Sequence, residues 1–231
     1  MRGSQVATPV VVEPVSEAPC PGDEGMRERL VVLARHASKA TLLTVPSVNR
    51  TRVAAALHQL SLERYTGLHV LVGAGVPSAA FALYRPQLEA YIRGAWYHRC
   101  ATDEQIDDFI AGEEPPSPKK QMMALERSGA FDPGSLVRLK EMTWKNLCDF
   151  THGGAIQVKA RAAKLGQISQ NFKLEHVAAL LTSSATTAFL ASIGIAAVAD
   201  DEQTVLQLRD AFNSIYPKLQ GQALHEHIDP E

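Results

Sequence analysis

The chain has 231 residues, of which 45% are hydrophobic and 21% are charged, as in ordinary globular proteins and unlike disordered or collagen-like chains. Its formal net charge of -2 argues against non-specific binding of duplex DNA, which usually needs an excess of cations. Cys20, Cys100 and Cys148 form no CxxC pair, so they indicate neither a disulfide framework nor a structural zinc site, and a cytoplasmic location is expected.

The first 25 residues are predicted to be a disordered N-terminal arm. Prolines interrupt it repeatedly between Pro9 and Pro21, and proline neither continues a helix nor donates to a sheet. A signal peptide would need a more basic start and a longer apolar core. Residues 26–218 are predicted to form a single helical domain, and residues 219–231 a flexible C-terminal tail.

Apolar spacing and helix-terminating residues predict the helices in chain order. Ser47 is expected to cap a helix that carries apolar residues to Leu60, and Thr102 with Gln105 has the form of a capping box. Pro86 predicts a kink or a restart within its helix. The predicted segments are 30–43, 47–60, a shorter stretch ending at 73, 78–100, 102–111, 122–127, 135–152, 155–165, 174–198 and a last one from 201 to 217.

The segment 113–118, with the sequence EEPPSP, is the clearest interior break and is predicted to be a surface loop. No segment shows a convincing alternation of apolar and polar residues that would indicate a strand. The fold is therefore predicted to be all-α, a bundle of about seven to nine helices.

Residues 177–199 carry no charge and are long enough to cross a bilayer. They are rich in Ala, Ser and Thr, and neither a basic cluster nor an aromatic belt flanks them. A helix at the centre of a bundle, where neighbours approach closely, explains this composition well. We expect a buried core helix, with a membrane-associated protein as the alternative.

The first group of candidate site residues lies on the predicted helix 78–100. Arg85, Glu89 and Arg93 follow one another at intervals of four, and His98 comes five residues later. They could form a solvated ladder of ion pairs, or they could face the interior, where charges must be paired and often build a site. Their aromatic and apolar neighbours are Tyr84, Leu88, Tyr91, Ile92, Trp96 and Tyr97.

The second group lies on the predicted helix 135–152. Lys145, Asp149 and His152 share one face at i, i+4 and i+7, and the glycine pair Gly153-Gly154 follows. A cation, a carboxylate that can orient an imidazole and a histidine make a plausible acid–base set. The alternative is a helix end stabilised by a histidine and stopped by glycine.

The two groups together resemble the HEPN superfamily, whose signature is an arginine, commonly with a polar residue after it, and a histidine that is separated from the arginine by four to six positions. Lys145-Asn146 followed by His152 is similar to that signature, with Lys in place of Arg. Glu89 and Arg93 resemble the family's upstream acidic–basic pair. Arg93 with His98 is a second match, although Gly94 stands at the polar position.

The resemblance implies an all-helical bacterial protein, a metal-independent ribonuclease of toxin–antitoxin, phage-defence or RNA-processing systems. His152 would act as general base or acid, Lys145 would stabilise the phosphorane, and Glu89 with Arg93 would orient them. The family's homodimers join two such sites, and we expect Tyr84, Tyr91 and Trp96 to be exposed and to suit the face of a homodimer.

Three functional interpretations stay open: a HEPN-like endoribonuclease, a non-catalytic helical binding protein of the same fold, and a membrane-associated helical protein. RNA, an antitoxin or another protein, and a second copy of the chain are the expected partners, while duplex DNA and a membrane are not. Cys148 and His152 have the spacing of metal ligands but no third ligand, so neither a metal nor a cofactor is predicted.

Overall fold

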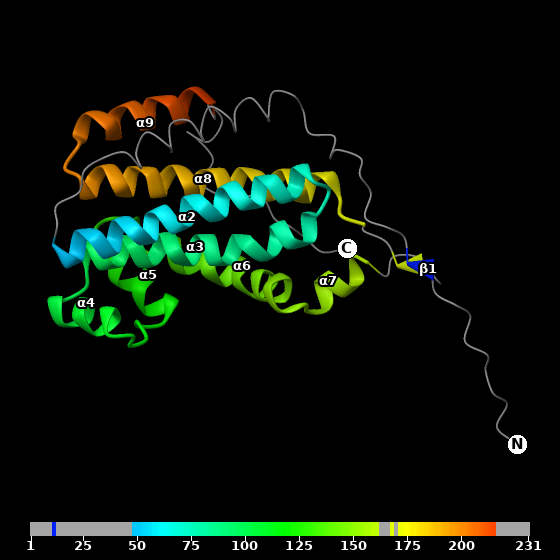
Figure 1. Cartoon of the computed structure of the whole chain (residues 1–231), viewed down its shortest axis with the longest axis horizontal. Coiled ribbons are helices and arrows are strands. Elements are labelled where there is room, and N and C mark those ends of the chain that lie inside the picture. The colour runs from blue at the N-terminus through cyan, green and yellow to red at the C-terminus, as the bar shows by residue number, and fades with distance from the viewer. Residues whose placement is uncertain (1–10, 13–47, 162–166, 169–170, 216–231) are drawn as a thin grey trace, which may run out of the picture.

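A computed structural model describes residues 11–12, 48–161, 167–168 and 171–215, shown as coloured ribbons in Figure 1. Within these ranges the chain is helical except for one short strand pair, so the predicted all-α class is confirmed there. The helices are α2 (Asn49–Gly73), α3 (Pro77–Arg99), α4 (Asp103–Ile110), α5 (Pro118–Arg127), α6 (Ser135–His152), α7 (Ala155–Lys159), α8 (Leu174–Val198) and α9 (Glu202–Ile215).

Several predicted features lie outside the described residues. They are the helix 30–43, the cap Ser47, the end of the last helix at Pro217, the tail 219–231, and the arm 1–25 except for two residues. Those two form strand β1 (Val11–Val12), which pairs in parallel with β2 (Gln167–Ile168).

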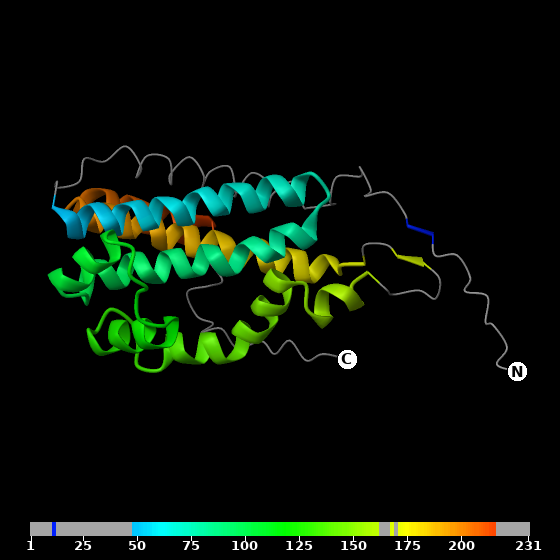
Figure 2. The same cartoon turned by 60° about the horizontal axis from the view of Figure 1, so that its bottom comes forward.

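The core lies where α2, α3 and α8 pack side by side (Figure 1). α9 covers α8 on one side, while α5 and α6 pack against α3 on the other, and Figure 2 shows this second layer below α3. α2 is one helix rather than the two predicted elements, because Leu62, Tyr65, Leu68 and Val72 continue its buried face without a break.

α3 runs through Pro86 without the restart that the proline predicted. Buried side-chain hydrogen bonds hold the helix at this point. Ser61 Oγ of α2 donates to the Gln87 carbonyl over 3.0 Å. The Gln87 amide donates to the Ser184 carbonyl of α8 over 2.8 Å and accepts from Ser184 Oγ over 2.6 Å. Because these partners are fully buried, three helices are tied together at one level.

Helix ends follow local chemistry. Thr102 and Gln105 form the predicted capping box, with both reciprocal hydrogen bonds present. α5 begins at Pro118, earlier than predicted, because proline suits the first position of a helix. α6 ends as predicted at Gly153, whose φ of 68° is a left-handed conformation that glycine adopts without strain. α7 is shorter than predicted and ends at Lys159.

α8 is long and apolar enough to cross a membrane by length and composition, but 61% of its most apolar stretch is buried within the fold. It packs against α2, α3 and α9. Alanine and serine on its buried face, such as Ala185, Ala191 and Ser192, allow close approach of these neighbours. A position in the bundle therefore accounts for its composition.

His58 of α2 occupies the centre of the bundle. It is 1% exposed, and its Nδ1 has no hydrogen-bond partner within the described ranges. The ring lies between Gly94 of α3 and Gly194 of α8, since a β-carbon on either glycine would collide with it. Burial, and secondarily the charge of His98, lowers the pKa of His58 from 6.5 to about 3. The imidazole is therefore neutral in the folded protein at neutral pH.

This buried histidine predicts acid sensitivity. Because its pKa is lower in the folded than in the unfolded chain, the stability it allows is present above pH 6.5 and is lost as the pH falls toward about 3. Between pH 7 and 4.5 the loss from His58 should be on the order of 2–3 kcal/mol. Urea unfolding at the two pH values should show this loss in the free energy of unfolding. His58→Gln should reduce the difference in that free energy between pH 7 and pH 4.5. An equal difference in both proteins would contradict this assignment.

Candidate functional site

Arg85 of α3 is the centre of a polar cluster where α3 meets α6. Its Nε donates to Glu89 Oε1 over 2.9 Å, one turn along the same helix. Its Nη1 lies 3.3 Å from Cys148 Sγ and 3.1 Å from His152 Nε2, both on α6. We call Arg85, Glu89, Cys148 and His152 the α3–α6 cluster. It contains Arg85 and Glu89 from the first predicted group and His152 from the second.

The cluster is supported on one side and open on the other. The Trp144 ring lies beneath the guanidinium of Arg85, 5.2 Å from its Cζ, and Lys140 Nζ lies 5.0 Å from the same ring. The side chains of Arg85 and Glu89 keep 21% and 20% of their surface exposed, and His152 is exposed. A solvent-borne anion can therefore reach the guanidinium without unfolding the helices.

The contact between Arg85 and His152 restricts the state of the imidazole. A guanidinium only donates hydrogen bonds, so His152 Nε2 must accept, and the ring proton is assigned to Nδ1. A ring whose Nε2 carries a lone pair rather than a proton is the form that a general base requires. Nη2 of Arg85 takes part in none of these contacts, which leaves donors for an anion.

Of the residues predicted on α6, only His152 joins this cluster. Lys145 and Asn146 are exposed on the helix surface. Asp149 lies against the start of α7, where its Oδ2 accepts from the Ile156 backbone N–H over 3.4 Å. A β-carbon at Gly154 would lie 2.6 Å from the Asp149 carboxyl group, so the glycine pair serves this tight turn.

No hydrogen bond or ion pair joins the second predicted pair, Arg93 and His98, in the part of the chain that the structure describes. His98 lies near the end of α3, where burial and then the charges of Arg99 and Arg50 lower its pKa. Its charge acts on the buried His58. The charge of Arg93 acts on Arg64, whose pKa it helps to lower, and on Tyr97, whose pKa it also helps to lower against the effect of burial.

The aromatic residues expected at a dimer face are in the core. Tyr84, Tyr91 and Trp96 are 9%, 5% and 4% exposed. The charged residues Arg85, Glu89 and Arg93 are partly buried, as one interpretation of the sequence proposed. Their aromatic neighbours are buried and are not available to a partner. The expectation of an aromatic dimer face was wrong, because alternate sides of one helix carry the two residue types.

Sequence reasoning missed Trp144 and Lys140, and it considered Cys148 only as a metal ligand. The contacts of these three residues depend on how α3 crosses α6, and the local sequence pattern does not predict that crossing. No group of three His, Cys, Asp or Glu side chains within the described ranges could hold a metal ion.

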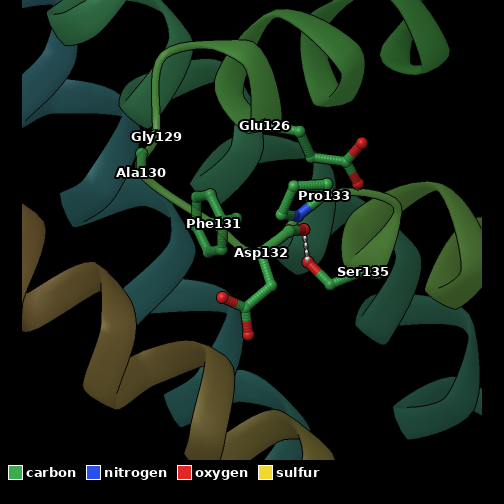
Figure 3. Close-up of a pocket in the computed structure, with 7 residues that line it drawn as sticks. All are labelled: Glu126, Gly129, Ala130, Phe131, Asp132, Pro133 and Ser135. Carbon is green, nitrogen blue, oxygen red and sulfur yellow. Dashed lines mark hydrogen bonds between the residues drawn. The ribbon is translucent and has the colours of Figure 1, made fainter.

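A shallow pocket at the α5–α6 turn is lined by residues from Glu126 to Ser135 (Figure 3). Glu126 Oε1 accepts from the backbone N–H groups of Leu136 and Val137 over 2.7 and 3.0 Å. The carboxylate thus satisfies the first N–H groups of α6. Ser135 Oγ donates to the Asp132 carbonyl across the turn. These contacts identify a helix-capping turn.

Comparison with known proteins gave one informative match. A family model, described as a family of unknown function (DUF6988), matches residues 58–218, which include α3 to α9 and most of α2. No curated protein and no solved structure matched the chain. Since the matched region covers more than half of the sequence and contains the whole α3–α6 cluster, the chain belongs to the DUF6988 family.

Proposed function

We propose that this protein is a HEPN-like, metal-independent endoribonuclease that acts on single-stranded RNA at the α3–α6 cluster. The observation that carries the proposal is the contact between Arg85 and His152, in which a guanidinium nitrogen lies 3.1 Å from the ring of an exposed histidine. Arginine is suited to phosphate because its planar fork offers several donors. The role that the sequence suggested for Lys145 therefore passes to Arg85.

In the proposed reaction, a ribose 2′-OH replaces Arg85 as the partner of His152 Nε2. His152 takes the hydroxyl proton while the 2′-oxygen attacks the adjacent phosphorus, and the bond to the 5′-oxygen breaks. Water protonates the departing oxygen, so the products carry a 2′,3′-cyclic phosphate and a 5′-hydroxyl. Arg85 stabilises the negative charge on the phosphorane, and Glu89 holds Arg85 in place.

One observation favours a second function, an RNA-binding protein that does not cleave. Asp149, the carboxylate best placed in sequence to orient His152, is engaged with α7. A histidine without an orienting carboxylate is a weaker base than one with it. Binding without cleavage would then be the activity of the same cluster.

The proposal includes a setting and an assembly. A cytoplasmic location would give the cluster access to RNA, and a toxin or phage-defence role would require control by a protein partner. Homodimers join two sites in the HEPN superfamily, and we extend that assembly to this chain. Light scattering of the full chain should return twice the mass of 25.1 kDa, and a single species at that mass would contradict the dimer.

Two matched variants test the site. Arg85→Gln should reduce cleavage of a single-stranded RNA in EDTA by about 100-fold or more, because the phosphorane loses its main donor. Lys145→Ala should leave cleavage within about twofold, because Lys145 is exposed and makes no hydrogen bond or ion pair with the cluster among the described residues. The measurement is the rate of appearance of 2′,3′-cyclic phosphate ends. Loss in Lys145→Ala with activity kept in Arg85→Gln would overturn the assignment of the clamp.

A further inference from the structure

Arg93 forms no ion pair with any carboxylate of the described residues. It lies one turn beyond Glu89 on α3, is half-buried, and its Nε is buried with no hydrogen-bond partner among the described residues. Glu89, the nearest carboxylate along the helix, is already paired with Arg85. A buried guanidinium nitrogen without a partner is costly and needs a physical explanation, and one such explanation is a bound anion.

A second arginine reaches the same region from α2. Arg64 Nη1 donates to the Pro86 carbonyl over 2.5 Å, so a backbone oxygen holds it rather than a carboxylate. Burial lowers the pKa of Arg64, Glu89 opposes that change, and Arg93 adds to it. Three arginines, Arg64, Arg85 and Arg93, thus share two carboxylates, Glu89 and Glu63, which leaves one positive charge in excess in a chain of net charge -2.

Arg93 and Arg85 are also at a useful separation for a nucleic acid strand. Eight residues along an α-helix correspond to about 12 Å. A stacked strand rises by about 3.4 Å per nucleotide, so roughly three nucleotides cover that distance. An anion at Arg93 would therefore be a more distant phosphate of the strand whose scissile phosphate lies at Arg85.

We propose that Arg93, with Arg64 beside it, forms a second phosphate subsite that binds single-stranded RNA a few nucleotides away from the α3–α6 cluster. This inference rests on the proposed function. The subsite supplies affinity and sets a minimum substrate length, while Arg85 and His152 supply the chemistry. A mononucleotide or a dinucleotide is too short to reach both sites.

Binding of non-cleavable 2′-O-methyl RNA to the full chain tests the subsite independently of cleavage. By fluorescence anisotropy, the wild-type protein should bind a hexanucleotide at least about tenfold more tightly than a dinucleotide, a difference of about 1.4 kcal/mol. Arg93→Gln should remove most of that advantage and leave dinucleotide binding unchanged. The slope of log K against log salt should fall in magnitude by about 0.7, the value for one phosphate of a single strand.

Arg52→Gln is the matched control, because Arg52 is an exposed arginine on the first turn of α2. It should keep both the length advantage and the salt slope. Equal affinities of Arg93→Gln and wild type for the hexanucleotide would overturn the subsite. A different result would also overturn the subsite: the wild type shows no length advantage, and inorganic phosphate competes for binding to the wild type but not to Arg93→Gln. That result would identify a site for free phosphate.

The two proposals fail in different ways. A protein that cleaves no RNA but shows the Arg93-dependent length advantage would refute the ribonuclease and support the subsite. A protein that cleaves dinucleotides and hexanucleotides with the same KM would support the ribonuclease and refute the subsite. Thermal melting of Arg93→Gln provides the folding check, and Arg93→Lys, which keeps the charge, should restore part of the hexanucleotide affinity if Arg93→Gln is unstable.

Discussion

Replacing His152 with alanine should reduce RNA cleavage by about 100- to 10,000-fold, the range expected for loss of a general acid–base group. His152 is exposed at the last turn of α6, so little packing is lost. Its favourable interaction with the helix dipole is worth at most about 1–2 kcal/mol. The melting temperature should therefore change by only a few degrees while the activity disappears.

His176→Ala is the matched control for this experiment. His176 is an exposed histidine in the first turn of α8, and it lies outside the cluster. Its replacement should leave both cleavage and melting unchanged. If His152→Ala cleaves RNA at the wild-type rate, His152 is not the base. If it unfolds the protein, the residue belongs to the structure and the proposed mechanism is wrong.

The largest effect on stability is expected at Gly194. An alanine β-carbon there would overlap the His58 ring, with Cε1 only 2.6 Å away. His58 is fully buried between α3 and α8 and cannot move aside, so the helices themselves must separate. Overpacking of this kind costs about 1–3 kcal/mol, and chemical unfolding of Gly194→Ala should show a loss of this size.

Gly67→Ala and a rescue variant separate this clash from a general effect of glycine. At Gly67, on α2, a β-carbon would meet only Leu83, at an ordinary 3.5 Å. Alanine there should stabilise the helix by about 0.5–1 kcal/mol. In a His58→Ala background, Gly194→Ala should no longer be destabilising. A loss that persists without the His58 ring would show that its cause lies elsewhere.

Local sequence patterns predict much of this fold. Apolar residues at helical spacing define α8 with the observed ends, and Gly153 stops α6 where glycine was expected to stop it. The capping box of α4 forms because both of its partners lie within one turn. Each of these features depends on residues that are neighbours in the chain, so the sequence alone contains the necessary information.

The assembly of the site depends on contacts that the local pattern does not contain. His152 is predicted to be functional from its place before two glycines, but the identity of its partner requires the crossing of α3 and α6. Arg85 rather than Arg93 lies at that crossing. Lys145 shares a helix face with His152 by spacing, yet it is exposed and stands apart from the cluster.

The same limit explains Asp149. Helical spacing places it near His152, which suggested an orienting carboxylate. The chain turns back at Gly154, however, and brings the α7 N–H groups to that carboxylate. The N-terminus of a helix attracts negative charge, so the Asp149 carboxylate lies at the start of α7 rather than beside His152, which it was expected to orient.

The central claim is that Arg85 and His152 act together on one phosphodiester, and a double-mutant cycle tests it most directly. The rates kcat/KM would be measured in EDTA for wild type, Arg85→Gln, His152→Ala and the double variant, with melting curves for all four. The effects of replacing residues that act as a unit are strongly non-additive. The double variant should therefore have about the same kcat/KM as the less active of the two single variants. Independent, multiplicative losses, or a wild-type protein that produces no 2′,3′-cyclic phosphate ends, would contradict the claim.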